Sequence, residues 1–238
     1  MTWSDDDGAS WGGPVDMTQH LVPEDYAWDA VGPGIGIQTM VGPGAGRLVI
    51  PAIGRNIYSD DNGRSWRYQR IHARTSEGTI VELANGVLMR NDRAVRSLWK
   101  QHRRRMVSFG SIDAESWSPW IPHAILLDPA SQGSVLRYTS ANPSRILFLN
   151  SASTKTRTTM RVRISYDEGL SWPIQRRLPE PTWAPRALGG YSSMVKSADS
   201  MVGALVEVND DRGDTPNSHR SIVFQKFNLP WILDGTPE

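Results

Sequence analysis

Apolar and polar residues alternate over short stretches of this chain, a pattern typical of strands with one buried face. The clearest stretch spans residues 160–166, with apolar side chains at positions 160, 162, 164 and 166 and polar ones between them. No segment keeps the apolar spacing of an amphipathic helix over about ten residues. The pattern therefore predicts an all-β fold.

Pairs of such stretches flank turn residues and predict β-hairpins. Residues 79–83 and 87–91 enclose Asn85-Gly86, a dipeptide that favours a tight hairpin turn. Similar pairs are 134–139 with 145–149 and 192–196 with 201–208, and a last strand is predicted over 220–229.

A motif of the form Ser-x-Asp-x-Gly-x-Ser-Trp divides the chain into similar units. Full copies span residues 4–11, 59–66 and 165–172, and a degenerate copy spans 111–117. The closing tryptophans, at positions 11, 66, 117 and 172, are 55, 51 and 55 residues apart. Four short strands and one fixed turn per roughly 50 residues are the signature of a β-propeller blade. The fold class predicted is a β-propeller, with about four to five blades in this chain.

The motif is explained best as a turn. Its Asp accepts backbone N–H bonds, its Gly adopts a positive φ and its Trp fills the space beneath. The acidic run 5–7 could instead suggest a calcium site, but an EF-hand loop needs flanking helices and a Glu about twelve positions in. The five histidines have no partners at metal-ligand spacing. We therefore expect no metal and no cofactor.

Composition narrows the classes of function. The 26 basic and 25 acidic residues give a net charge of +1, which excludes a broad electrostatic grip on nucleic acid or an anionic membrane. The basic run 100–105 is expected to be a solvated edge. The absence of cysteine excludes disulfides and a cysteine nucleophile. No apolar run approaches the roughly 18 residues of a membrane span. The 10 Trp, 21 Gly and 16 Pro residues fit a turn-rich all-β fold.

Several segments resemble the sialidase (neuraminidase) family, whose Asp box, or BNR repeat, is the motif above. Residues 30–38 and 46–52 are similar to its Gly-Pro-Gly-x-Gly-Ile-Gln and Gly-Arg-Leu-Val-x-Pro-Ala segments, and further matches lie at 132–134 and 163–169. The resemblance runs in order from residue 4 to about 229. It implies a six-bladed propeller that removes terminal sialic acid from glycoconjugates with retention at the anomeric carbon, and hence sialylated glycans as partners.

The resemblance also implies roles for individual residues. Tyr191 matches the nucleophilic tyrosine, and Glu77 matches the glutamate that takes its proton. Arg93 and Arg157 match two arginines of the triad that binds the substrate carboxylate. Glu207 matches an acidic residue that orients an arginine.

These residue types suit the substrate. Sialic acid carries a carboxylate on its anomeric carbon, and arginines bind carboxylates with paired, charge-assisted hydrogen bonds. A carboxylate nucleophile about 4 Å away would be repelled by roughly 1 kcal/mol in water and about 4 kcal/mol at an effective dielectric near 20. A neutral tyrosine avoids this repulsion, although a phenol with a pKa near 10 needs a base within hydrogen-bond reach.

The chain departs from the family pattern in several places. Ile35 stands where His is frequent, and Ser76 replaces the usual Asn before the glutamate. The first triad arginine and the acid/base aspartate would precede the first motif and have no counterpart. We therefore expect residues 1–238 to form a partial sialidase-like propeller, incomplete at its N-terminus and inactive or poorly stable alone.

Two other hypotheses remain open: a sialic-acid-binding propeller without catalysis, and a purely structural Asp-box propeller. Under the first, Tyr191→Phe would preserve sialoside binding; under the second, the candidate residues would lie scattered across the fold. Linkage preference, hydrolysis versus transglycosylation, oligomeric state and compartment also stay open.

Overall fold

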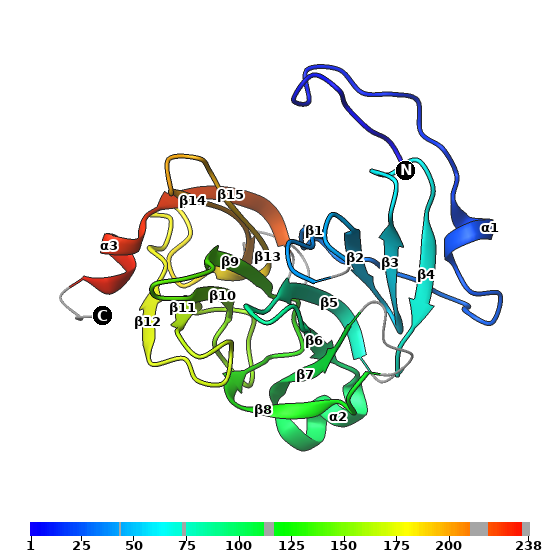
Figure 1. The fold of residues 1–238 in the computed structure, drawn as a ribbon. Helices are drawn as coiled ribbons and strands as arrows, with labels where there is room; N and C mark the ends of the chain where they lie inside the picture. The colour runs from blue at the N-terminus through cyan, green and yellow to red at the C-terminus, as the bar shows by residue number, and fades with distance from the viewer. Residues whose placement is uncertain (43, 73–74, 112–116, 210–218, 235–238) are drawn as a thin grey trace.

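The computed structural model describes residues 1–42, 44–72, 75–111, 117–209 and 219–234. Within these ranges the chain folds as four antiparallel sheets arranged side by side around a common centre (Figure 1). The first sheet comprises β1 (Ile37–Gln38), β2 (Leu48–Ala52), β3 (Arg55–Ser59) and β4 (Arg67–Arg70), and the second comprises β5 (Thr75–Glu82), β6 (Leu88–Ala94), β7 (Arg104–Gly110) and β8 (Ile121–Leu127). The third comprises β9 (Ser134–Thr139), β10 (Arg145–Ser151), β11 (Met160–Ser165) and β12 (Ile174–Arg177), and the fourth comprises β13 (Leu188–Lys196), β14 (Val202–Asn209) and β15 (His219–Phe227).

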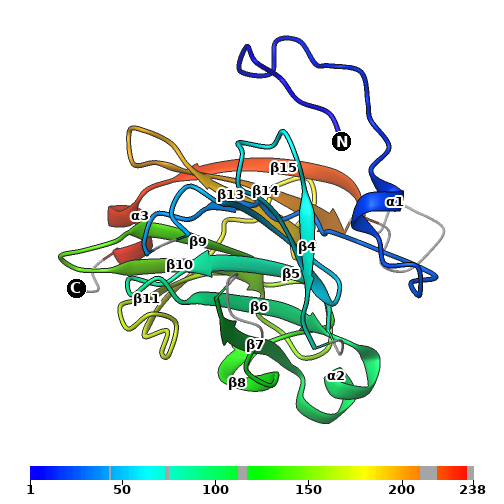
Figure 2. The ribbon, with the colours of Figure 1, turned by 45° about the vertical axis from the view of Figure 1, so that its right-hand side comes forward.

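Each sheet is a meander in which every strand pairs with the next one along the chain. The first strands face the common centre, where β5 contacts β9 and β9 contacts β13 (Figure 2). This arrangement confirms the predicted β-propeller, with four blades in the described part of the chain.

The predicted hairpins are confirmed by strand register. Thr79 pairs with Asn91 across the second sheet, and Gly86 in the connecting turn has a φ of +84°. The hairpins β9–β10 and β13–β14 also form as predicted. The alternating stretch 160–166 becomes β11, but its polar Arg163 is also buried. Arg163 is buried because β11 packs between neighbouring blades, and its guanidinium donates to Asn150 Oδ1 at 2.8 Å.

The apolar core is divided into layers between successive sheets. Val49 and Ile80 belong to the layer between the first and second sheets, and Val81 and Phe148 to the layer between the second and third. The largest layer joins the third and fourth sheets. Each sheet is therefore stabilised chiefly by its immediate neighbours.

The Asp-box turns form as predicted in the three full copies. In residues 59–66, Asp61 accepts bonds from the backbone N–H and the hydroxyl of Ser65, at 2.8 and 2.6 Å, and Gly63 has a φ of +84°. The same bonds recur in residues 4–11 and 165–172. In the degenerate copy, residues 112–116 lie outside the described residues.

The closing tryptophans differ in burial. Trp172 is 4% exposed and packs on Phe148, whereas Trp11 is 64% exposed, so the predicted plug is wrong for the first motif. Residues 1–15 form an irregular hairpin, closed by hydrogen bonds between Met1 and Val15, that belongs to none of the four described sheets. The Trp11 indole therefore has no sheet beneath it in this structure.

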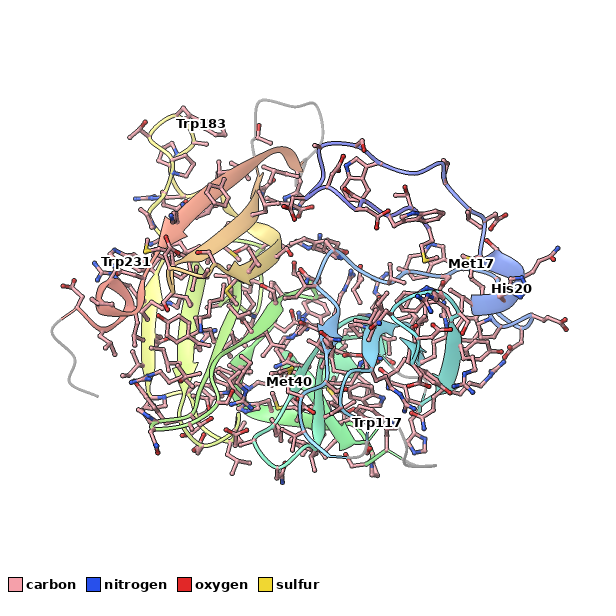
Figure 3. The ribbon with its side chains drawn as sticks, turned by 45° about the horizontal axis from the view of Figure 1, so that its top comes forward. Met17, His20, Met40, Trp117, Trp183 and Trp231 are labelled. Atoms are coloured by element: carbon pink, nitrogen blue, oxygen red, sulfur yellow. The ribbon has the colours of Figure 1, made fainter. Side chains whose placement is uncertain are left out.

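The helices are short: α1 (Thr18–Leu21), α2 (Arg96–His102) and α3 (Leu229–Leu233). Trp231 on α3 lies at the outer edge of the molecule (Figure 3), where the Arg176 guanidinium stacks on its ring at 4.2 Å. None of the helices in the described ranges is long and apolar enough to cross a membrane.

One part of the basic run 100–105 contradicts the expected solvated edge. Arg105 on β7 is fully buried. Its guanidinium donates to the side chain and backbone of Asn91, at 2.8 and 2.9 Å, and to the Ser131 carbonyl. These acceptors replace water, which is why a charged side chain can occupy the interior.

Candidate functional site

The strand directions bring most of the candidate residues to one end of the propeller. Glu77 lies near the start of β5 and Arg93 near the end of β6, and these two strands are antiparallel. Tyr191 lies near the start of β13, and Arg157 lies in the loop between β10 and β11. The Asp boxes at 59–66 and 165–172 link the third and fourth strands of their sheets and therefore lie at the opposite end.

Two β-bulges aim the central side chains. The register of β5 with β6 shifts between Thr75 and Gly78, on either side of Glu77. The register of β13 with β14 shifts between Leu188 and Ser192, on either side of Tyr191. Because a bulge turns a side chain out of the regular alternation, both can point into the same space.

That space is a cavity of about 670 Å³ at this end of the propeller. It is lined by Trp28, Ser76, Glu77, Arg93, Ala94, Val95, Arg96, Trp99, Ala130 and Tyr191.

Tyr191, Glu77 and Arg93 form a closed hydrogen-bonded group in the cavity. The Tyr191 hydroxyl donates to Glu77 Oε1. Arg93 Nη1 donates to Glu77 Oε1 and Oε2, at 2.9 and 3.0 Å, and to Tyr191 Oη at 2.9 Å. A phenol, a carboxylate and a guanidinium thus meet pairwise, which is the geometry of a nucleophile with its base and a cation beside both.

Glu77 is held in its charged form. Burial by itself raises the pKa of this carboxyl, which is 6% exposed. Hydrogen bonds from Tyr191 and Ser76 and the charge of Arg93 outweigh burial and hold the pKa below its ordinary value. The residue can therefore accept a proton near neutral pH.

Tyr191 is held in its protonated form. Burial, followed by its hydrogen bond to the negatively charged Glu77, raises the pKa of the phenol to about 12. The charges of Arg93 and Arg157 act in the opposite direction. These cations therefore favour the phenolate form of the side chain.

Arg157 lies over the ring of Tyr191. Its guanidinium carbon lies 5.3 Å from the centre of the phenol ring, within the range of a cation–π contact. Its Nη2 donates to the Ala130 carbonyl at 3.0 Å. Two arginines therefore flank the tyrosine, and the four residues that could have been scattered converge on one site.

Glu207 on β14 contacts the backbone of the tyrosine. Its Oε2 accepts the Tyr191 N–H at 2.7 Å and lies 3.6 Å from His219 Nδ1. Within the described residues its hydrogen bond is thus to a backbone amide rather than to the arginine expected from the sequence. This contact requires glycine at the preceding position. Gly190 has a φ of +126°, and a Cβ there would lie only 2.4 Å from Glu207 Oε2.

Sequence reasoning missed several residues that line the cavity. Trp28 comes from the segment before β1, Arg96 and Trp99 come from α2, and Ala130 comes from the turn between β8 and β9. The aromatic and cationic types of the first three are a weak signal for a binding site, but Ala130 carries none. No group of three potential metal ligands occurs among the described residues.

The fold and site define a class: a β-propeller with Asp-box turns at one end and a tyrosine, carboxylate and arginine group at the other. Residues 1–204 match the model of the BNR repeat-like domain. The chain therefore belongs to the BNR repeat-like domain family.

Curated relatives carry more specific names. The chain is 47% identical to an "Exo-alpha-sialidase" of Aspergillus fumigatus and 45% identical to one of Arthroderma benhamiae. Each alignment covers 99% of this chain and 56% of the relative. The chain thus spans about half the length of these curated relatives.

Solved structures share the fold. A leech intramolecular trans-sialidase, complexed with 2,7-anhydro-Neu5Ac, is 25% identical with a TM-score of 0.78, over 99% of this chain and 37% of that one. An intramolecular trans-sialidase from Ruminococcus gnavus is 23% identical with a TM-score of 0.78, over 97% of this chain and 50% of that one. The second likeness concerns the fold alone.

Proposed function

We propose that this chain carries the nucleophile side of the active site of an exo-α-sialidase, with Tyr191 as the nucleophile and Glu77 as its base. The observation that carries the proposal is the group in which the Tyr191 hydroxyl donates to Glu77 while Arg93 Nη1 lies 2.9 Å from Tyr191 Oη. The names of the two fungal relatives support it. Residues 1–238 would act as one unit in this role.

The substrate carboxylate would bind between the two arginines. Arg157 uses one N–H bond on the Ala130 carbonyl, and a guanidinium has five donors. Arg93 would turn part of its hydrogen bonding from Glu77 and Tyr191 toward the ligand. Binding would thereby place the anomeric carbon next to Tyr191 Oη.

The bond changes follow from this placement. Tyr191 Oη would form a bond to the anomeric carbon as its proton moves to Glu77, and the bond from that carbon to the leaving oxygen would break. The leaving oxygen would take a proton from a general acid. Attack on the anomeric carbon by water, or by an acceptor sugar, would then break its bond to Tyr191 Oη with retention; the conjugate base of the general acid would take the proton of the attacking hydroxyl, and Glu77 would return its proton to the tyrosine.

The general acid is not among the residues identified around the cavity. Glu77 is the only carboxylate among the described lining residues, and it is the proposed base. Loss of a general acid typically costs about 10²–10⁴-fold in rate. We therefore expect the chain by itself to bind sialosides better than it cleaves them.

A sialic-acid-binding propeller without catalysis is the second candidate function. Two features of the site favour this second function. Two arginines flank the site and could bind a carboxylate, but the described lining of the cavity holds a single carboxylate. A purely structural role explains less, since it gives no reason for a phenol, a guanidinium and a buried carboxylate to meet in a cavity.

A fluorogenic sialoside assay with paired binding measurements separates these functions. The chain is compared with a hybrid that adds the part of the Aspergillus fumigatus relative that it does not cover. Under the proposal, the hybrid cleaves the sialoside, and Tyr191→Phe abolishes cleavage while binding persists. The matched control is Tyr138→Phe. The Tyr138 hydroxyl donates to the Ser200 carbonyl, and this residue lines no part of the cavity. Binding without cleavage by the hybrid would favour the second function, and no binding by either protein would contradict both.

A further inference from the structure

The turn between β8 and β9 contains a strained residue that lines the cavity. Ala130 has a φ of +61°, in the left-handed region that residues with a Cβ seldom adopt. Its carbonyl accepts the Nη2–H of Arg157 at 3.0 Å. Backbone strain of this kind persists only where the surroundings enforce it, and it gathers at functional sites.

Buried groups hold this turn from several sides. Asp128 is fully buried, and its Oδ1 accepts the Ser131 N–H at 3.0 Å, closing the turn on itself. The Asp128 backbone donates to the Arg103 carbonyl at 3.1 Å and accepts from the Trp99 indole at 2.7 Å. The position of Ala130 is therefore set by the residues on either side of it.

A buried arginine connects the turn to the strand that carries Arg93. Arg105 donates to the Ser131 carbonyl and, through two other donors, to the Asn91 side chain and backbone. Its Nη1 also lies 3.7 Å from Asp128 Oδ2. Asn91 lies two residues before Arg93 on β6. The buried Arg105 thus contacts both the turn that bonds Arg157 and the strand that carries Arg93.

We propose that the turn of residues 128–131 is a preformed clamp that fixes the guanidinium of Arg157 for its ligand. In this role Ala130 supplies the carbonyl, and Asp128 and Arg105 are positioning residues. The clamp holds Nη2, and the remaining donors of Arg157 make no other hydrogen bond to the described residues. A guanidinium fixed before binding loses less rotamer freedom when a carboxylate arrives. The part that concerns the ligand rests on the proposed function.

The substitution Ala130→Gly tests the clamp with little risk to the fold. Glycine adopts a positive φ without strain, so the turn can form but is no longer rigid. The matched control is Ser200→Gly, at a residue whose φ is +62° and which lies in the turn before β14, away from the cavity. Binding of N-acetylneuraminic acid is expected to weaken about three- to tenfold in Ala130→Gly and to stay unchanged in the control. Both variants should melt at similar temperatures.

A double-mutant cycle shows whether Ala130 acts through Arg157. In an Arg157→Ala background, Ala130→Gly should have no further effect on binding, because the group that the clamp holds is gone. An undiminished loss in that background would overturn the proposal, as would unchanged binding in Ala130→Gly alone.

A measurement without ligand separates the clamp from the proposed function. Side-chain nitrogen-15 NMR, with the Arg157 signals assigned by their absence in Arg157→Lys, reports rotation of the guanidinium. Rotation should be restricted in the unchanged chain and faster in Ala130→Gly, and equal rotation in both would overturn the clamp. Failure of the unchanged chain to bind N-acetylneuraminic acid would count against the proposed function, and the NMR comparison would still decide the clamp.

Discussion

Gly189 on β13 lies directly against the backbone of Arg157, so closely that a Cβ on the glycine would be 2.1 Å from the Arg157 carbonyl oxygen. A single residue, Gly190, separates this glycine from Tyr191. The strand that carries Tyr191 and the loop that carries Arg157 can therefore approach this closely only while position 189 has no side chain.

We expect Gly189→Ala to displace the Arg157 loop. Overpacking of this kind costs about 1–3 kcal/mol of folding stability, and the shift should also weaken binding of N-acetylneuraminic acid. Thermal melting and calorimetric binding measure the two effects. Gly13→Ala is the control, since a Cβ there meets no atom within 4 Å. Equal behaviour of the two variants would show that the contact is relaxed without consequence.

The substitution Glu77→Gln should lower the pKa of Tyr191 below the present value of about 12. Burial remains and still raises the pKa, but the negative charge beside the phenol is removed while Arg93 and Arg157 still favour the phenolate. Absorbance titration at alkaline pH, taken as the difference from the same protein with Tyr191→Phe, isolates this group. A pKa that stays constant or rises would contradict the assigned electrostatics.

Glu168 should stabilise the fold in a pH-dependent way. Burial raises its pKa, but hydrogen bonds from Arg137 and Ser144 outweigh burial and lower the pKa to about 2. Because the folded-state pKa lies below the ordinary value of 4.5, the stabilisation is complete above pH 4.5 and is lost as pH falls toward 2. Glu168→Gln should cost about 1–2 kcal/mol at neutral pH, allowing for the partial exposure of the pair.

Denaturant unfolding of both proteins between neutral pH and about pH 2 checks this prediction. The gap between them should be constant above pH 4.5 and should narrow below it. Glu24→Gln, in the segment after α1, serves as a control at an exposed carboxylate. A gap that widens in acid would reverse the assigned sign.

The first and last Asp-box tryptophans should differ in their contribution to stability. Trp172→Ala removes a side chain that is 4% exposed and should cost about 3–5 kcal/mol. Trp11→Ala, at a site that is 64% exposed, should change stability by less than about 0.5 kcal/mol. Chemical denaturation of the two variants compares their free energies of unfolding at the same position of the motif. A large loss of stability in Trp11→Ala would imply a contact of Trp11 that this structure does not contain.

Much of this arrangement could be predicted because it depends on short-range patterns. Asn85-Gly86 sets a hairpin register, and this register brings Glu77 and Arg93 to the same end of the second sheet. The motif spacing gives the blade count. Tyr191 required the family resemblance, since nothing in its local pattern separates it from a packing tyrosine.

Other features depend on contacts between blades, which alternation along one strand does not encode. Arg105 has the sequence context of a solvated edge but is buried because acceptors on β6 and in the β8–β9 turn surround it. The left-handed Ala130 is enforced by the buried groups around Asp128, so no property of alanine predicts it. Trp11 illustrates the reverse case, where a regular motif lacks the sheet that would bury its indole.

The Tyr191–Glu77 hydrogen bond joins residues 114 positions apart, one on the fourth sheet and one on the second. Among the described residues each apolar layer joins successive sheets, so this polar contact links two sheets that share no such layer. A slight parting of these two blades would separate the phenol from its carboxylate before any core side chain met water. On warming, the Tyr191–Glu77 hydrogen bond should therefore be lost at a temperature at which the four sheets are still folded.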